Sequence, residues 1–196
     1  MVVAARDALE RLRAGNLRFA SDRQTSTAST SAERRAQVLA GQEPFAVILG
    51  CSDSRVPAEI VFDQGLGDLF VIRVAGNIVA PSQIGSVEFA VERFGTRLVV
   101  VLGHSGCGAV MATIEQLEQP RAERSRGLAA IVDRIRPAVE PFMDHPDRMT
   151  LAVRANVRAV VEHLRQALEP QRSDGLLVVG AEYALETGVV KYLEES

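Results

Sequence analysis

The stretch FAVILGCSDSRVP, residues 45–57, joins a run of apolar residues to a group of polar and charged ones. The apolar part does not alternate with polar positions, which is typical of a parallel strand that is buried on both faces of a sheet. Cys51, Asp53 and Arg55 follow this part directly. A strand that only filled a core would not end in such residues, so we interpret its end as a functional surface.

Three further apolar runs of the same kind occur along the chain: LFVIRV at 69–74, RLVVVLG at 97–103 and GLLVVGA at 175–181. Helical patterns lie between the runs, at 82–94, 107–118, 127–140 and 150–168. This alternation predicts an α/β fold, with an open, mainly parallel sheet of about four strands and helices on both faces. A hairpin around Glu186, Thr187 and Gly188 is expected to add one antiparallel strand at an edge.

The N-terminal part of the chain precedes this core. Apolar spacing in 5–19 predicts a helix that ends in a turn at the Gly-Asn pair, residues 15–16. The segment 21–31 is rich in Ser and Thr and is expected to be a mobile loop. A second helix is predicted over 32–42, closing at Gly41.

Length and composition set the class of protein. The chain has 196 residues, of which 47% are hydrophobic and 24% charged. This predicts one domain over 1–196, with N-terminal helices and a loop in 1–44 and the α/β core in 45–196. A net charge of −3 offers no basic surface for nucleic acid, and no apolar stretch approaches a membrane span. The charged N-terminal segment lacks the apolar part of a signal peptide, so we expect a cytoplasmic protein.

Two of the predicted strands end in residues that bind metals. RLVVVLG runs into His104-Ser105-Gly106-Cys107, as the first strand runs into Cys51. If these strands are neighbours, Cys51, Asp53, His104 and Cys107 meet at one place, because sites form beyond the carboxyl ends of parallel strands. Two thiolates and an imidazole suit tetrahedral Zn²⁺. A helix is expected after Cys107, and the positive field at its N-terminus favours the thiolate form of Cys107 over the thiol.

Three protein ligands leave a fourth position on the metal. Either Asp53 fills it and the site is closed, or water fills it and the site is catalytic. Arg55 favours the second alternative, because a bidentate pair with Asp53 can hold the carboxylate off the metal. Asp53 could then orient a zinc-bound water with a pKa of about 7, which gives hydroxide at neutral pH.

Three segments resemble the signature motifs of the β-class carbonic anhydrases: CSDSRVP (51–57), RVAGN (73–77) and GHSGCGA (103–109). The resemblance extends from ALERLRAGNLRF (8–19) to VVGAEYALETGVV (178–190). It implies a carbonate dehydratase, a zinc lyase that hydrates CO₂ reversibly to bicarbonate and a proton by attack of zinc-bound hydroxide.

The same resemblance implies roles for individual residues. One Zn²⁺ per subunit would be held by Cys51, His104 and Cys107, and Asp53 with Arg55 would form the catalytic dyad. The plant-like branch of the family lines its substrate pocket with Gln, Phe and Tyr. Positions expected to bind substrate here are Gln42, Phe70, Phe89, which replaces the Tyr, and Gly108.

The resemblance also implies an assembly. Members of the family form homodimers, often paired into tetramers, with the pocket at the subunit interface and the N-terminal helix packed on a neighbour. The expected partners are thus CO₂ or bicarbonate and further copies of the chain.

Three alternatives remain open at this point. The same zinc site could hydrolyse carbonyl sulfide or carbon disulfide, which are linear apolar molecules like CO₂. A non-catalytic zinc protein would have its fourth position permanently closed by Asp53. A thiol redox protein would instead join Cys51 and Cys107 and bind no metal.

Overall fold

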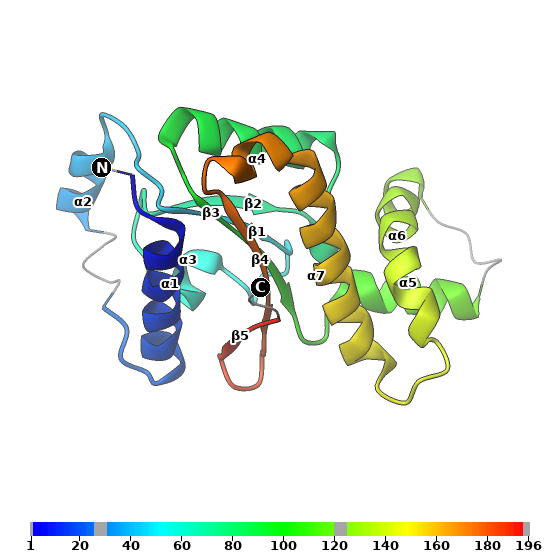
Figure 1. Ribbon diagram of the computed structural model, residues 1–196. Helices are drawn as coiled ribbons and strands as arrows, with labels where there is room; N and C mark the ends of the chain where they lie inside the picture. The colour runs from blue at the N-terminus through cyan, green and yellow to red at the C-terminus, as the bar shows by residue number, and fades with distance from the viewer. Residues whose placement is uncertain (1, 26–30, 120–124, 194–196) are drawn as a thin grey trace.

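A mixed sheet runs through the centre of the computed structural model, which describes residues 2–25, 31–119 and 125–193 (Figure 1). Its strands, in the spatial order β2-β1-β3-β4-β5, are β1 (Ala46–Gly50), β2 (Leu69–Arg73), β3 (Leu98–His104), β4 (Leu177–Tyr183) and β5 (Val190–Tyr192). The pairs β1–β2, β1–β3 and β3–β4 are parallel, and β5 is antiparallel to β4 at the edge. The predicted fold class, with its antiparallel edge strand, is confirmed.

The helices are α1 (Ala5–Ala20), α2 (Ala32–Val38), α3 (Ala58–Val61), α4 (Pro81–Phe94), α5 (Gly108–Glu118), α6 (Arg126–Val139), α7 (Arg148–Ala167) and α8 (Glu169–Ser173). Short 3₁₀ turns, η2 (Ala75–Asn77) and η3 (Glu140–Phe142), follow β2 and α6. The four helices predicted between the strands correspond to α4, α5, α6 and α7.

Both faces of the sheet are covered. Ile48 of β1 points to the side of α1 and α3, whereas its neighbours Val47 and Leu49 point to the side of α4 and α7. Side chains of a strand alternate between faces, so every position of β1 is buried and the run reads as continuously apolar. Helices α5 and α6 lie beside α7, away from the centre of the sheet (Figure 1).

The predicted end of the first helix at the Gly-Asn pair is wrong, because α1 continues through it to Ala20. A Cβ on Gly15 would lie 1.9 Å from the carbonyl oxygen of Phe62, so glycine lets α1 approach that backbone closely. Asn16 is buried, and its Nδ2 donates to the carbonyl oxygens of Val61 and Gly188 at 3.1 and 2.9 Å. The pair therefore docks the helix rather than ending it.

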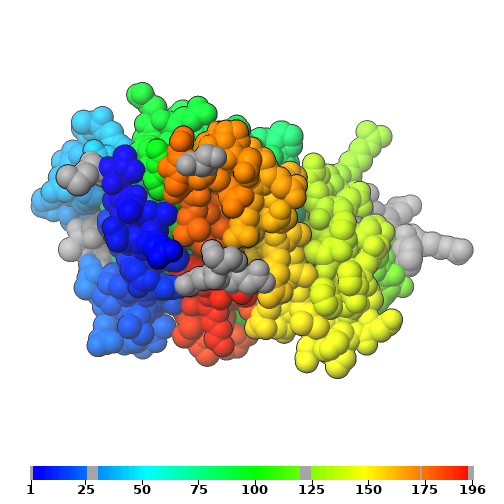
Figure 2. Space-filling model, viewed as in Figure 1, coloured from blue at the N-terminus to red at the C-terminus, as the bar shows by residue number. Residues whose placement is uncertain are grey.

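The N-terminal region differs from expectation in one more respect. Helix α1 buries an apolar side on α3 and the sheet of its own chain, and its packing on a neighbouring subunit stays a prediction. Figure 2 shows helix α1, in blue, beside the C-terminal hairpin, in red. Helix α2 ends at Val38 and not at Gly41, and it buries no residue that would hold a further turn. Residues 26–30 of the predicted mobile loop lie outside the described residues.

Within the described part of the chain, no helix combines the length and the apolar character that crossing a membrane requires.

Candidate metal centre and active site

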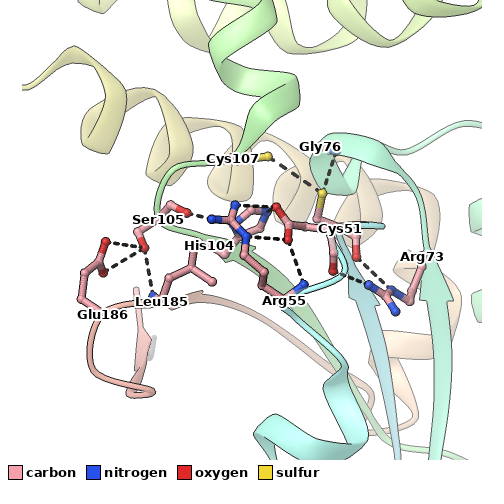
Figure 3. A network of polar contacts seen from close by, with 10 residues as sticks. Cys51, Arg55, Arg73, Gly76, His104, Ser105, Cys107, Leu185 and Glu186 are labelled. Carbon is pink, nitrogen blue, oxygen red and sulfur yellow. Dashed lines mark hydrogen bonds and ion pairs between the residues drawn. The ribbon is translucent and has the colours of Figure 1, made fainter.

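The carboxyl ends of β1 and β3 lie together because the two strands are parallel neighbours. Cys51 follows β1, His104 is the last residue of β3, and Cys107 is the N-cap of α5. All three are buried, and their ligand atoms lie within 4.8 Å of one another (Figure 3). The structure therefore brings together the three residues that the sequence placed at strand ends.

His104 is fully buried and presents one ring nitrogen to this cluster. Its Nδ1 lies 2.9 Å from the carbonyl oxygen of Ser105, which can only accept, so Nδ1 carries the hydrogen and Nε2 the lone pair. Nε2 is buried without a hydrogen-bond partner among the described residues. A buried polar atom of this kind is costly unless something binds it, and a metal ion would. The donor set therefore fits a metal ion.

The two sulfur atoms lie 3.9 Å apart, within hydrogen-bonding distance for sulfur. A hydrogen bond from Cys107 lowers the pKa of Cys51 to about 4, and the Gly76 N–H also donates to the Cys51 sulfur at 3.3 Å. The contact with Cys51, together with burial, raises the pKa of Cys107. The N–H groups of Ala109 and Val110 at the start of α5 oppose this. The helix thus favours the thiolate as predicted, but the net shift is upward because two adjacent sulfurs share one proton.

The groups around His104 favour a positive charge at the ring. Burial opposes the charged form of the ring, but the Cys51 sulfur and the Ser105 carbonyl favour it, and the pKa of His104 is raised. The Asp53 Oδ2 atom lies 3.9 Å from Nε2 and adds to this effect. Surroundings that favour a proton on the ring would also favour a cation beside it.

Asp53 and Arg55 form the pair that the sequence predicted. Asp53 Oδ1 accepts from the backbone N and the Nε of Arg55, both at 2.9 Å, and Oδ2 accepts from Nη2 at 2.7 Å. The guanidinium holds the pKa of Asp53 far below its usual range, so the group is a carboxylate at neutral pH. The Arg55 side chain is 57% exposed and that of Asp53 15%, so the pair lies between the buried cluster and solvent.

Sequence reasoning missed a second contact, made by Arg73 at the end of β2. Its Nε donates to the carbonyl oxygen of Cys51 at 3.0 Å, and its Nη2 donates to that of Asp53 (Figure 3). The only available signal was the position of Arg73 at the end of a predicted strand, within RVAGN. Its partners are backbone atoms, which no residue type in the sequence reveals.

The predicted substrate-binding residues fall into two groups. Gly108 begins α5, next to Cys107. Gln42 precedes β1, and Phe70 pairs with Val47 in the sheet, about 10 Å from the carboxyl end of β1 at roughly 3.3 Å per residue. The Phe89 ring on α4 lies 6.2 Å from that of Phe70. Within one chain, these three residues therefore do not lie beside the metal centre.

With this geometry in hand, comparison with known proteins gives the family. A family model described as carbonic anhydrase matches residues 46–190. The chain is 39% identical over 184 residues to carbonic anhydrase 2 of Mycobacterium tuberculosis, which is 90% of this chain and 87% of that protein. It is 46% identical over 128 residues to a carbonic anhydrase of Mycolicibacterium smegmatis, covering 65% of this chain and 61% of that one.

The fold matches solved structures as well. One of two tetrameric β-carbonic anhydrases from the ascomycete Sordaria macrospora aligns with a TM-score of 0.72 at 25% identity, over 81% of this chain and 84% of that one. The open α/β sheet with cysteine and histidine at two strand ends thus defines the class of protein. The chain belongs to the β-carbonic anhydrase family.

Proposed function

We propose that this protein is a zinc-dependent carbonic anhydrase that interconverts CO₂ and bicarbonate, with zinc held by Cys51, His104 and Cys107. The observation that carries the proposal is the buried Nε2 of His104, which has no hydrogen-bond partner within the described residues and faces the two sulfurs. Soft thiolates and an imidazole are ligands that zinc prefers. Thiolate ligands also suit a reducing compartment, which agrees with a cytoplasmic protein.

Zinc held by Cys51, His104 and Cys107 would lower the pKa of water to about 7 and so would supply hydroxide at neutral pH. Asp53 is ionised and can accept a hydrogen bond from the nucleophile, which orients it towards the carbon of the substrate. Arg55 keeps this carboxylate in place through two donors on its guanidinium and one on its backbone. Arg55 lies on the exposed side of the pair, so the carboxylate is next to the solvent with which CO₂, bicarbonate and the proton must exchange.

The same contacts support the catalytic alternative over a closed, non-catalytic site. Both oxygens of Asp53 already accept hydrogen bonds from Arg55, and this bidentate pair holds the carboxylate toward the guanidinium and away from a fourth ligand position. We therefore expect the open arrangement near neutral pH.

Metal analysis and two activity assays on the purified protein test the proposal. We expect one zinc per chain and rapid CO₂ hydration in stopped-flow measurements. Brisk sulfide release from carbonyl sulfide or carbon disulfide without CO₂ turnover would favour the hydrolase alternative. Active protein without metal, or a disulfide between Cys51 and Cys107 in metal-free protein from a reducing lysate, would refute the zinc site.

We further propose that Gln42, Phe70 and Phe89 line the pocket of a second copy in a homodimer, or a dimer of dimers. Apolar side chains are exposed near these residues: Leu39 is 87% exposed and Phe89 52%. A hollow of about 600 Å³ is lined by Gln42, Leu39 and Phe94. The Phe94 ring lies 6.0 Å from that of Phe70 and 5.6 Å from that of Phe89. Exposed apolar surface around a hollow is typical of an interaction site, and a second copy would cover it.

Co-expression of two defective variants tests this arrangement. Asp53→Asn and Gln42→Ala would damage a site from opposite subunits, so a mixed dimer would hold one intact site and one doubly damaged site. Random pairing then gives about a quarter of the sites intact. Asp53→Asn with Arg55→Ala is the matched control, because both changes act from the same subunit and no site is intact. Equal activity in the two mixtures would contradict the proposal.

A further inference from the structure

The side chain of His104 has its orientation fixed by a single backbone group. Its Nδ1 donates to the carbonyl oxygen of Ser105 at 2.9 Å, and this contact decides which ring nitrogen carries the lone pair. The next residue, Gly106, has a φ of +61°, and a Cβ built on it would meet no atom within 4 Å. Gly106 is also exposed, so packing at this residue does little to hold the peptide that bears the carbonyl, and the contacts of Ser105 hold it instead.

Every polar atom of Ser105 has a partner. Its N–H donates to the carbonyl oxygen of Tyr183 at 2.9 Å. Its Oγ accepts from the N–H of Leu185 at 3.0 Å and donates to the carboxylate of Glu186, with distances of 3.0 and 3.3 Å to the two oxygens (Figure 3). Apart from the ring of His104, these partners belong to the end of β4 and the turn that follows it.

The turn between β4 and β5 is itself fixed. The N–H of Ala184 donates to Val189 O, and the N–H of Gly188 donates to Ala184 O, both at 2.9 Å. Asn16 of α1 donates to Gly188 O at 2.9 Å and accepts from the N–H of Val190 at 2.8 Å. A continuous series of hydrogen bonds therefore connects α1, through the turn between β4 and β5, with Ser105.

We infer that Ser105, held by Leu185 and Glu186, is a positioning residue that sets the ring orientation and the tautomer of His104 for metal binding. The inference rests on the proposed metal centre and adds to it a support from a distant part of the chain. Groups that receive the second N–H of a ligating histidine commonly change metal affinity by 10- to 100-fold when they are lost. Here that group is a carbonyl whose position depends on one hydroxyl and one carboxylate.

Metal affinity of purified variants tests the inference without recourse to activity. Binding of Co²⁺, followed by its visible absorption, and Zn²⁺ competition with a chelator would be measured. For Ser105→Ala we expect affinity to fall about 10-fold or more and the Co²⁺ bands to shift, because the ring is no longer held in one orientation. For Glu186→Ala we expect a loss of roughly fivefold, the effect of one hydrogen bond.

Conservative variants and a control separate positioning from general stability. Glu186→Gln retains an acceptor oxygen and should recover most of the affinity lost in Glu186→Ala. Ser82→Ala removes an exposed hydroxyl that bonds to Gln83 on α4 and should leave affinity and spectrum unchanged. Because Glu186 is exposed, its variants are expected to fold even if Ser105→Ala does not.

The outcomes distinguish this inference from the proposed function. Failure of the unaltered protein to bind either metal would refute both. Normal metal binding by the unaltered protein, with the same affinity and spectrum in Ser105→Ala and in Glu186→Ala, would refute the positioning role alone. If Ser105→Ala is unfolded, unchanged binding in Glu186→Ala is sufficient to refute it.

Discussion

The ends of β1 and β3 meet at the candidate metal centre, but they are built differently. At the end of β3, His104 and Cys107 are 0% and 1% exposed. At the end of β1, Cys51 is buried, Asp53 is partly exposed and Arg55 is exposed, so the chain runs from the core to the surface. The β3 end thus contributes only buried ligand atoms, whereas the β1 end combines one ligand with a charged pair at the surface.

This difference suggests a division of tasks. Changes at buried ligand atoms should remove the metal, because a zinc site of this kind uses at least three protein ligands. Changes to the exposed pair should leave the metal in place and affect turnover instead. The largest effect is therefore expected where a ligand is lost.

Replacement of Cys107 by serine should abolish both metal binding and CO₂ hydration. A hydroxyl is a poor ligand for zinc beside one thiolate and one imidazole, and the loss should exceed the roughly 100-fold effect of an indirect contact. Metal content by elemental analysis and turnover by stopped-flow measure it, with Cys51→Ser as the matched variant of the other strand end. One zinc per chain with normal turnover in Cys107→Ser would exclude this residue as a ligand.

Replacement of Asp53 by asparagine should reduce turnover while the metal stays bound. The amide has nearly the same shape but no charge, and a positioned proton acceptor contributes about 10²- to 10⁴-fold in rate. The assay is stopped-flow CO₂ hydration on protein whose zinc content has been measured. Loss of metal together with activity would instead show that Asp53 is a ligand and that the two strand ends do not divide their tasks.

Arg55→Ala should lower turnover by about 10²-fold without lowering metal affinity, since it frees Asp53 to approach the metal. Asp53 Oδ2 is already 3.9 Å from the His104 ring nitrogen, so only a small movement is needed. X-ray absorption at the zinc edge would report an added oxygen ligand from the protein. A spectrum identical to that of the unaltered protein would mean that Arg55 does not keep the carboxylate away.

Much of this architecture was predictable from residue type alone. Continuous apolar runs identified the four parallel strands, because a strand buried on both faces has no polar positions. Cys51, His104 and Cys107 were recognised as a group because parallel strands direct their carboxyl ends to one edge. The cluster found there agrees with that reasoning.

Other features depend on backbone positions that residue types do not encode. The carbonyl groups bound by Arg73 and by the His104 ring belong to Cys51, Asp53 and Ser105, and any residue has such a group. The Gly-Asn pair of α1 resembled a helix end because its partners lie far away in sequence. The location of Phe70 at the amino end of the sheet likewise follows from register, which the sequence leaves open.

Arg73→Met should have an intermediate effect, which we expect to be about a tenfold loss of turnover with zinc retained. It removes two hydrogen bonds that hold the backbone around Asp53, so the carboxylate is less well placed. Arg73→Lys should recover part of the rate, and Arg126→Met, at the exposed start of α6, serves as a control. A change in metal affinity without a change in rate would assign Arg73 to the support of Cys51 alone.

The smallest effect on turnover is expected for Asn16→Ala, within about twofold, although the protein should be clearly less stable. Its side chain makes three hydrogen bonds, to Val61, Gly188 and Val190, and their loss should lower the free energy of unfolding by about 3 kcal/mol. Urea unfolding measures this, and turnover below the transition shows whether the site survives. These contacts reach the candidate metal centre by two paths. Gly188 and Val190 flank the turn that holds Ser105 at the β3 end, whereas Val61 ends α3, the helix that follows Arg55 at the β1 end. We expect the path through the turn to dominate. A variant that keeps its stability but loses turnover as severely as Asp53→Asn would show that α1 acts on the charged pair of the β1 end, and the two ends would no longer be separable.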